Sequence, residues 1–413
     1  MNLLYLFLEP PLPPANGLRM RTRAVLRAIA AAGHDVRLVG FGSLEQAAAL
    51  RAEGWTAEVV PAAVGSLSQP GQLASRWRAL LAGSAYAIGR FENPELRRKI
   101  SASLDGGRCD AVLVDTIYPA ANLPLHLGVP LLVNSHNVEH LLLRRYAESE
   151  WRPHRRGYAG IEWRRLRSFE RQLFRHAQHI WACSRFDRDY IKRLAPDTAC
   201  TVLPNTVPVI PNLPAEPANA HTVLFTGGLD WLPNRQAVLW FLARVWPRLR
   251  AQAPEARWVV AGRNPPADLC RRLAEAGVEV RASVLDMRAV FAEASVCIAP
   301  LRIASGTRLK ILEAGAMGKP VVATRRGAEG LNLSPGREIV IADDPAEMAT
   351  AIARLLRDAA TRRAIGAAAR SRIREEYAPQ VLASILRHDL ASVIRPAVAC
   401  SRAARPLVAE RSQ

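Results

Sequence analysis

Residues 296–324, VCIAPLRIASGTRLKILEAGAMGKPVVAT, contain the pattern that decides the fold. A short apolar run that ends at Pro300 predicts a buried strand, and after a polar loop a helical pattern occupies 306–317. A second apolar run at 320–323 predicts another strand. A strand, a helix and a strand in this order form a βαβ unit, which places the two strands parallel in one sheet.

The same alternation occurs in two regions of the chain. Before residue 205 the expected strands are 3–8, 35–41, 111–115, 130–134 and 179–183, with a helix from about Leu18 to Gly33. After residue 220 the expected strands are 222–226, 258–261, 278–281, 296–299, 320–323 and 338–341, and the expected helices are 235–252, 266–276, 306–317 and those from Pro345 onward. Between the two regions, five prolines at 204–219 interrupt the alternation of strands and helices. We therefore expect an N-terminal Rossmann-like domain at 1–205, a linker at 206–220 and a second such domain at 221–375. A C-terminal helix at 376–395, which could return to the first domain, and a flexible tail at 396–413 complete the expected organisation.

The loop and helix start within 296–324 have the residue types of an anion site. The loop contains Ser305, Gly306 and Thr307, and the expected first turn of the helix contains Arg308 and Lys310. Free backbone N–H groups at a helix start attract anions, and basic side chains there are unfavourable unless an anion compensates them. Glu313 follows one turn later and could accept hydrogen bonds from a ribose diol. An ordinary ion pair between Lys310 and Glu313 would explain the same spacing, so both interpretations stay open.

Composition is typical of a folded, water-soluble chain of two domains. Of the 413 residues, 49% are apolar and 23% are charged, and no apolar run is long enough to span a bilayer. The opening apolar run is too short for a secretory signal, so we expect a cytoplasmic protein. The six cysteines are scattered and suggest neither a zinc site nor a disulfide framework. The net charge of +19 indicates an anionic partner without identifying it.

Several motifs, in the same order along the chain, resemble those of one enzyme family. Lys310 and Glu313 lie in the segment most similar to the donor-site signature of retaining GT-B glycosyltransferases of family 4. The similar segments are PPLPPANGLRMRTRAVLRAIAAAGHDVRLV (10–39), VNSHNVEH (133–140), ACSRFDRDYI (182–191), VLPNTV (202–207), FTGGLDWLPN (225–234), VVAGRNP (259–265) and AEGLNL (328–333). The sequence most resembles the branch associated with exopolysaccharide clusters.

This resemblance implies a fold, an activity and a set of site residues. The fold would be GT-B, with two Rossmann-like α/β domains facing a central cleft. The activity would be transfer of a sugar, with retention, from a nucleotide-sugar co-substrate to a glycan or lipid-linked acceptor in surface polysaccharide synthesis. Protein cations would do the work of a metal, so neither a metal nor another cofactor is expected. The resemblance assigns catalysis to His136, Arg308 and Lys310. Donor binding would involve Gly17, in the loop before the first helix, and Gly227, Arg263, Ser305, Gly306, Thr307 and Glu313.

The chain departs from the family pattern at three positions. The first acid of the family's E-x7-E pair would fall at position 305, where this chain has Ser305, so only Glu313 remains. The family's arginine and lysine after the first donor-domain strand correspond to Gly228 and Asn234. These departures affect sugar recognition more than nucleotide recognition. The base, the sugar, the acceptor, the linkage and the oligomeric state are not predicted by the sequence.

Alternatives of other classes exist for two further patterns. His136, Glu139 and His140 match the H-x-x-E-H pattern of inverted zinc peptidases, although His136 directly follows an expected strand. The stretch 144–175 has ten arginines against four acids, a difference of +6, with aromatic residues between them. Binding to nucleic acid, an arginine face on the domain surface, or an interfacial helix at an anionic membrane would each account for it. A nucleotide-sugar epimerase of the same fold is the remaining alternative.

Overall fold

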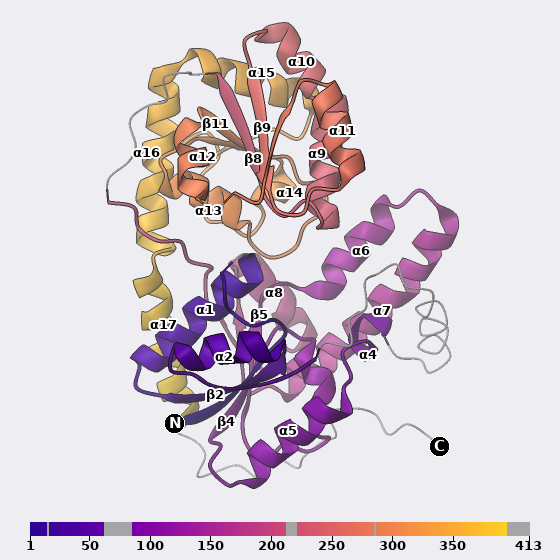
Figure 1. The fold of residues 1–413 in the computed structure, drawn as a ribbon, viewed down its shortest axis with the longest axis vertical. Coiled ribbons are helices and arrows are strands. Elements are labelled where there is room, and N and C mark those ends of the chain that lie inside the picture. The colour runs from indigo at the N-terminus through magenta and orange to yellow at the C-terminus, as the bar shows by residue number, and fades with distance from the viewer. Residues whose placement is uncertain (15, 62–84, 212–220, 285, 395–413) are drawn as a thin grey trace. The chain divides into compact units, whose positions relative to one another are not determined.

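The computed structural model describes residues 1–14, 16–61, 85–211, 221–284 and 286–394. The chain divides into two compact units: unit 1 comprises Met1–Pro204 and the chain from Leu382 onward, and unit 2 comprises Asn205–Val381. Each unit has one parallel sheet with helices on its faces (Figure 1). The part of the expected linker at 212–220 and the expected tail at 396–413 lie outside the described residues. No helix within the described ranges combines the length and hydropathy needed to cross a bilayer.

Unit 1 contains a seven-stranded sheet in the order β3-β2-β1-β4-β5-β6-β7. Successive connections run outward from β1 in one direction and from β4 in the other, so ligands are expected at the carboxyl ends of these two neighbours. The strands are β1 (Asn2–Phe7), β2 (Asp35–Phe41), β3 (Thr56–Val60), β4 (Ala111–Asp115), β5 (Leu131–Ser135), β6 (His179–Ala182) and β7 (Ala199–Val202). The helices are α1 (Gly17–Ala31), α2 (Leu44–Ala52), α4 (Tyr86–Gly89), α5 (Pro94–Asp105), the short 3-10 helix η1 (Pro119–Asn122), α6 (Glu139–Ser149), α7 (Pro153–His176) and α8 (Arg185–Leu194).

Side chains of β1 alternate between two cores, as successive residues of a strand must. Leu3, Tyr5 and Phe7 pack in a core with α1 and with the last helix, α17 (Pro379–Ile394). Leu4 and Leu6 pack on the opposite face with α5, α7 and α8. Because both faces are covered, the central strands are continuous apolar runs, which is why the sequence revealed them.

Unit 2 has a six-stranded sheet in the order β10-β9-β8-β11-β12-β13, and its connections reverse between β8 and β11. The strands are β8 (Thr222–Thr226), β9 (Arg257–Gly262), β10 (Glu279–Ala282), β11 (Val296–Ala299), β12 (Val321–Ala323) and β13 (Val340–Ile341). The helices are α9 (Leu232–Arg244), α10 (Trp246–Gln252), α11 (Ala267–Glu275), α12 (Met287–Glu293), α13 (Leu309–Ala316), α14 (Arg325–Ala328), α15 (Pro345–Arg357) and α16 (Ala359–Glu376). Residues 205–211 pack on this unit, where Val207 N donates to Tyr377 O at 3.0 Å.

Two helix predictions were wrong in their limits. The helix expected at 235–252 is two helices, because Pro247 lacks an N–H and its ring excludes a continuous helix through this point. The helix expected from Gly306 begins at Leu309 instead. Gly306 has φ +72°, a left-handed conformation that cannot be part of a right-handed helix.

Candidate functional site

The loop between β8 and α9 is a tight glycine turn at the carboxyl end of the first strand of unit 2. Gly227 has φ +143°, a conformation that favours glycine. A Cβ atom on Gly227 would lie 2.7 Å from Asn234 Nδ2 and 3.0 Å from Lys310 Nζ. A Cβ atom on Gly262, at the end of β9, would collide with the carbonyl oxygen of Gly227. Two glycines therefore let two strand ends and a lysine approach one another closely.

Lys310 is held at this turn by contacts to two other elements. Its Nζ donates to Asn234 Oδ1 at 2.8 Å and lies 3.9 Å from the centroid of the Phe225 ring. Asn234 in turn donates from Nδ2 to Gly228 O at 2.9 Å. Burial, aided by the charge of Arg308 and opposed by Glu313, lowers the pKa of Lys310 to about 7. The side chain is thus a positioned amine that is only partly protonated near pH 7, and an added anion would favour its charged form.

Glu313 and Arg263 supply further charges beside this lysine. Glu313 lies one turn beyond Lys310 on α13, and burial raises the pKa of its carboxyl while the lysine partly offsets that effect. Within the described part of the chain, the Glu313 carboxylate has no hydrogen-bond partner. Arg263 directly follows β9, and its Nε lies 3.2 Å from the position of a Cβ atom on Gly228. Asp230 Oδ1 also lies 2.9 Å from that Cβ position, so two carboxyl groups and two basic groups lie around the glycine turn.

The predicted anion loop has a different internal structure from the expected one. Arg308 is the N-cap residue of α13, not part of its first turn, and its side chain is buried. Its guanidinium donates to the carbonyl oxygens of Ser305, Gly306 and Glu329. Thr307 Oγ1 accepts a hydrogen bond from Asn205 Nδ2 at 2.6 Å. Arg308 therefore holds the loop in its bent conformation, and Lys310 alone of the two basic residues lies in the first turn of the helix.

In unit 1, the predicted histidine belongs to a buried network at the ends of β4 and β5. His136 Nε2 lies 2.8 Å from Asp115 Oδ1, and Asn134 Nδ2 donates to the same oxygen at 2.6 Å. Thr22 donates to the other carboxylate oxygen. Burial acts to raise the pKa of Asp115, but His136 and the hydrogen bonds outweigh it and hold that pKa below its usual value. Asp115 thus remains an anion that orients His136 at a strand end.

Arg21, on α1, joins this network from the other side. It donates from Nε and Nη2 to Asn134 Oδ1 at 3.1 and 2.7 Å, and from Nη1 to Leu203 O at 2.8 Å. Gly17 was expected in the loop before this helix, but it is the first residue of α1. Asn16 is the N-cap there and accepts from Arg19 N at 2.8 Å. The correction follows from cap chemistry, since an asparagine before a helical pattern marks the helix start.

The three residues of the H-x-x-E-H pattern have separate partners. His136 pairs with Asp115, and His140 pairs with the buried carboxylate of Glu170. Glu139 accepts hydrogen bonds from Tyr118 at 3.0 Å and from Asn137 at 3.1 Å. Over the ranges that the structure describes, no group of three or more His, Cys, Asp or Glu side chains is arranged to hold a metal ion. The contacts therefore do not have the geometry of the peptidase site.

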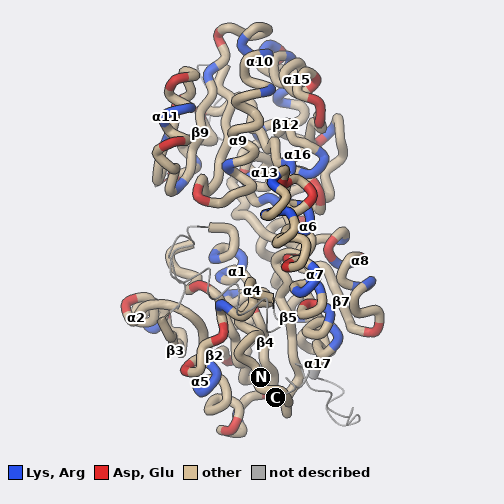
Figure 2. The backbone as a smooth tube through the Cα atoms, turned by 90° about the vertical axis from the view of Figure 1, so that its right-hand side faces the viewer, with Lys and Arg blue, Asp and Glu red and all other residues tan. Residues whose placement is uncertain are grey.

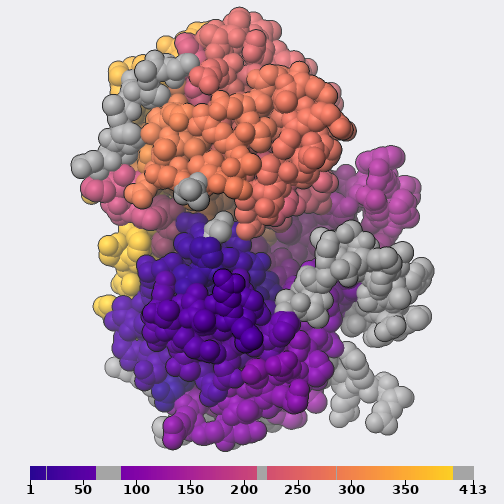
Figure 3. Space-filling view, viewed as in Figure 1, coloured from indigo at the N-terminus to yellow at the C-terminus, as the bar shows by residue number. Residues whose placement is uncertain are grey.

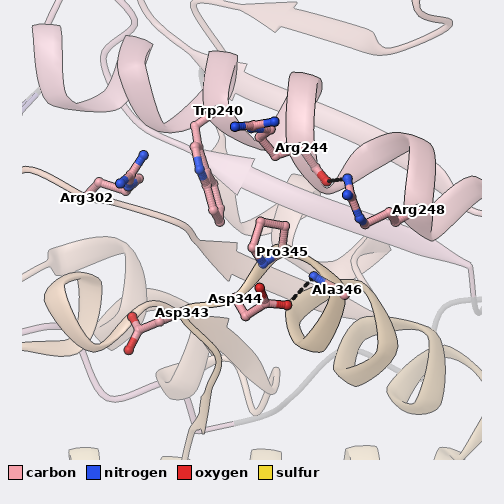
Figure 4. A pocket seen from close by; sticks show the side chains of 8 residues that line it. All are labelled: Trp240, Arg244, Arg248, Arg302, Asp343, Asp344, Pro345 and Ala346. Atoms are coloured by element: carbon pink, nitrogen blue, oxygen red, sulfur yellow. Dashed lines mark hydrogen bonds between the residues drawn. The ribbon is translucent and has the colours of Figure 1, made fainter. Parts of the chain in front are cut away.

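A separate cavity of about 350 Å³ lies elsewhere in unit 2 (Figure 4). Arg302 stacks on one side of Trp240, with its guanidinium carbon 5.8 Å from the ring centroid. The lining residues are Trp240, Arg244, Arg248, Arg302, Asp343, Asp344, Pro345 and Ala346. This cavity contains none of the predicted site residues. We place the candidate site at the glycine turn because Lys310 and Glu313 of α13 and Arg263, which follows β9, lie around it.

The structure thus brings together Gly227, Lys310 and Glu313, with Arg263 beside them, while Ser305–Arg308 form the adjoining loop. The sequence did not identify Asp115, the residue that orients His136. An acid at the end of a wholly apolar strand was the signal that could have revealed it. The sequence noted Asn234 only as a departure from the family pattern. It did not reveal that the Asn234 side chain accepts a hydrogen bond from Lys310.

Two family matches cover most of the chain. Residues 16–206 match the family described as "Glycosyl transferase 4-like domain", and residues 220–358 match "Glycosyl transferases group 1". A curated relative from Klebsiella pneumoniae, "Uncharacterized 44.6 kDa protein in cps region", is 27% identical over 199 residues. That alignment covers 45% of this chain, and the chain spans about half of the relative's length (51%).

Solved structures share the fold at low sequence identity. Anabaena HepE in complex with UDP-glucose has a TM-score of 0.65 at 14% identity, covering 95% of this chain and 100% of that one. Sucrose-phosphate synthase from Thermosynechococcus elongatus has a TM-score of 0.66 at 17% identity with the same coverage. A variant of S. aureus TarM in complex with fondaparinux, alpha-GlcNAc-glycerol and UDP has a TM-score of 0.67 at 10% identity, covering 95% and 99%. The expected fold class, two parallel-sheet Rossmann-like domains, is confirmed. The chain therefore combines a glycosyl transferase 4-like domain with a glycosyl transferases group 1 domain, and it has the GT-B glycosyltransferase fold.

Proposed function

We propose that this protein transfers a sugar from a nucleotide-diphosphate sugar to a hydroxyl group of a glycan or lipid-linked acceptor during surface polysaccharide synthesis. The observation that carries the proposal is the position of Lys310 at the Gly227 turn, with Glu313 one helical turn away. HepE and TarM structures that share the fold contain UDP or UDP-glucose, which supports a diphosphate ligand. The similarity to a protein of a cps region supports the polysaccharide role.

The charges of the site fit the chemistry of a diphosphate leaving group. As the bond between the sugar carbon and the diphosphate oxygen breaks, negative charge grows on the phosphate oxygens, and preorganised cations stabilise it. We assign this role to Lys310 and Arg263, with Arg308 maintaining the loop that precedes α13. Glu313 is assigned to the ribose hydroxyls. Gly227 provides space for the phosphates, and Ser305, Gly306 and Thr307 border them.

Two mechanistic features belong to the proposal. The acceptor oxygen attacks the face that the diphosphate leaves, so the anomeric configuration is retained, and the departing phosphate takes the acceptor proton. Basic side chains neutralise the diphosphate, so turnover is expected without a divalent metal. In unit 1, His136 is the residue assigned to the sugar or the acceptor, with Asp115 fixing its orientation. Activity lost in EDTA and restored by Mg²⁺ or Mn²⁺ would overturn metal independence.

The experiment begins with a screen of nucleotide sugars for thermal stabilisation. A ligand present at 100 times its dissociation constant adds about 2.7 kcal/mol to the free energy of unfolding. The best ligand is then titrated by calorimetry into the wild type, Lys310→Ala, Glu313→Ala and the control Lys319→Gln. Loss of a hydrogen bond to a charged group costs about 1.5–3 kcal/mol, so both site variants should bind at least tenfold more weakly. Lys319, which donates to Ala292 O at 3.0 Å, should affect stability only.

The outcomes separate this proposal from the epimerase alternative. Incubation with donor alone should return the donor sugar unchanged, whereas incubation with an alkyl glycoside acceptor should yield a product with the donor's anomeric configuration. A new nucleotide sugar formed without acceptor would favour an epimerase. Unchanged affinity in both site variants would reject the site.

A further inference from the structure

The turn between α6 and α7, together with the first residues of α7, forms a tip of unusual composition. We name residues 151–156, Trp-Arg-Pro-His-Arg-Arg, the hairpin tip. Trp151 is 79% exposed, and His154, Arg155 and Arg156 are exposed beside it. The guanidinium carbon of Arg152 lies 5.2 Å from the Trp151 ring centroid. The tip therefore combines a large apolar ring in solvent with three guanidinium groups and no carboxylate.

The acids nearest to the tip are already engaged. Glu150 accepts from Tyr146 Oη at 2.8 Å and from Arg152 N at 3.1 Å. Glu148 pairs with Arg144 Nε at 2.8 Å. Figure 2 shows further basic residues along α7, the second helix of this hairpin, and others on α1 and α5. Hydrogen bonds from Tyr146 and Arg152 N, together with the charges of Arg155 and Arg152, lower the pKa of Glu150. Glu150 is therefore an anion beside the tip that offsets one of its three positive charges, and the tip keeps a net positive charge.

The tip is not needed to build the core of unit 1. The apolar face of α7 is used for that purpose, since Leu166, Leu173 and Phe174 are buried in the core. The hairpin ends in a protrusion, seen in magenta in Figure 3. Among the described contacts of Trp151 is the stacking of Arg152, which does not connect the ring to the core, and burial of so large a ring would be favourable.

We propose that the hairpin tip is a docking site for an anionic bilayer surface. Tryptophan rings favour the boundary between headgroups and acyl chains, and arginines are attracted to the negative surface potential of anionic lipids. A convex tip with a single ring fits a bilayer better than it fits single-stranded nucleic acid, which is bound in grooves with successive stacking rings. The inference needs no sugar chemistry, so it stands or fails independently of the proposed function.

The proposed docking site is a small part of the stretch 144–175, and it differs from the arginine stripe that Arg164, Arg167 and Arg171 form on α7. Arg164, Arg167 and Arg171 are exposed on α7, but the apolar residues that would insert beside them are in the core. Trp163 is the remaining aromatic residue there, and it is flanked by the guanidinium groups of Arg164 at 4.9 Å and Arg144 at 5.7 Å. The exposed apolar group beside the stripe is Ile161, a smaller side chain that is 43% exposed, whereas the tip presents the larger ring of Trp151 at 79%.

The experiment is sedimentation of the whole protein with vesicles, without nucleotide. Vesicles of equal parts phosphatidylglycerol and phosphatidylcholine should bind the wild type at low salt, and pure phosphatidylcholine vesicles should not. Changing Arg152, Arg155 and Arg156 together to Gln should weaken binding roughly a hundredfold, because each arginine near an anionic leaflet adds to the attraction and three are removed. Trp151→Ala should weaken binding at least about tenfold, as expected for loss of a large ring from the interface.

The matched control removes the same number of charges from the same helix. At about 0.1 M salt, where charges more than about 10 Å away are largely screened, Arg164, Arg167 and Arg171 changed together to Gln should stay within about threefold of the wild type, since they lie outside the tip. Equal losses of vesicle binding in the two triple variants would show that total charge attaches the protein, and would overturn the proposal that the hairpin tip is the docking site. Absence of binding to anionic vesicles, or binding of polyuridylate in place of vesicles, would also overturn the proposal.

Discussion

At the scale of single residues, Lys310 decides how the site responds to pH. Its pKa of about 7 lies below the usual value because the side chain is buried, so part of the population is neutral near pH 7. A bound diphosphate would favour the ammonium and raise that pKa. Binding should therefore take up a proton at any pH between the two values.

The predicted consequence is a fall in nucleotide-sugar affinity as pH rises. Above pH 7 the free protein must take up a proton before the diphosphate is neutralised, so affinity should decrease by up to about tenfold per pH unit until the pH reaches the raised pKa of Lys310 in the complex. Calorimetry of a nucleotide sugar in buffers of different ionisation enthalpy measures the protons taken up. Lys310→Met should bind weakly at every pH and show a flat profile. A flat profile in the wild type would contradict the assignment.

Gly227 offers a second test at this scale, with a control elsewhere in the same unit. Gly227→Ala places a methyl group 2.7 Å from Asn234 Nδ2 and 3.0 Å from Lys310 Nζ, and it also strains the backbone. Gly336 has φ +80° and open space, so Gly336→Ala carries the strain alone, about 1–3 kcal/mol. We expect both variants to unfold more easily, but only Gly227→Ala to lose nucleotide affinity. Calorimetry measures the nucleotide affinity of the two variants, and thermal unfolding measures their stability. Equal nucleotide affinity in Gly227→Ala and Gly336→Ala would show that the phosphates bind elsewhere.

At the scale of elements, α6 begins without a cap of its own. Its N-cap residue, Val138, has no side-chain acceptor. The carboxylate of Glu170, on α7, accepts instead from Glu139 N at 2.9 Å and from His140 N at 3.1 Å, and it pairs with the His140 ring. One fully buried side chain therefore joins the two helices of the hairpin at its base.

Glu170→Ala is predicted to loosen this hairpin. The change leaves two backbone N–H groups and a buried imidazole without their acceptor, which should lower the free energy of unfolding by about 3–5 kcal/mol. Glu170→Gln keeps one neutral acceptor and should lose less. The control is Glu148, which forms an exposed ion pair with Arg144 on α6. Glu148→Ala should change the free energy of unfolding by about 0.5 kcal/mol or less. Hydrogen exchange of the α6 amides measures the effect, and protected amides in Glu170→Ala would refute it.

The elements also show how far the sequence could predict the fold and the site. The central strands β1, β4 and β8 were predicted because burial on both faces makes them apolar runs. The edge strands β3 and β7 were missed, since half-buried edges contain polar residues and lack such a run. The site residues Lys310 and Glu313 could be chosen from local spacing. The contact of Lys310 with Asn234 spans 76 residues and appears only when the fold brings the starts of α9 and α13 together.

At the scale of the whole molecule, the last helix belongs to the unit with which the chain begins. Leu382, Leu386 and Leu390 of α17 are buried in the same core as Leu3 and Tyr5. Asp389 adds a polar contact, since its Oδ2 accepts from Trp181 Nε1 at 2.9 Å and from Thr201 Oγ1 at 2.6 Å. Unit 1 is therefore complete only after the chain has passed through unit 2.

Asp389 makes the attachment of α17 dependent on pH in a defined direction. Burial acts to raise its pKa, but His179, Thr201 and Trp181 outweigh burial and hold the pKa below its usual value. Because the folded pKa is depressed, the stabilisation is complete above the unfolded pKa of about 3.9 and is lost as pH falls through the lower folded value. Asp389→Asn should therefore cost about 2–4 kcal/mol near neutral pH, and its difference from the wild type should shrink in acid.

Two probes follow this attachment without assuming that the whole chain unfolds in one step. Hydrogen exchange reports the opening of α17, and the fluorescence of Trp181 reports the loss of its carboxylate partner. The control is Asp105→Asn at the exposed end of α5, which should leave both probes unchanged. If Asp389→Asn exchanged its α17 amides as slowly as the wild type at pH 7, the leucine contacts alone would hold the helix. If the difference between the two proteins persisted in acid, the charge of Asp389 would not be its cause.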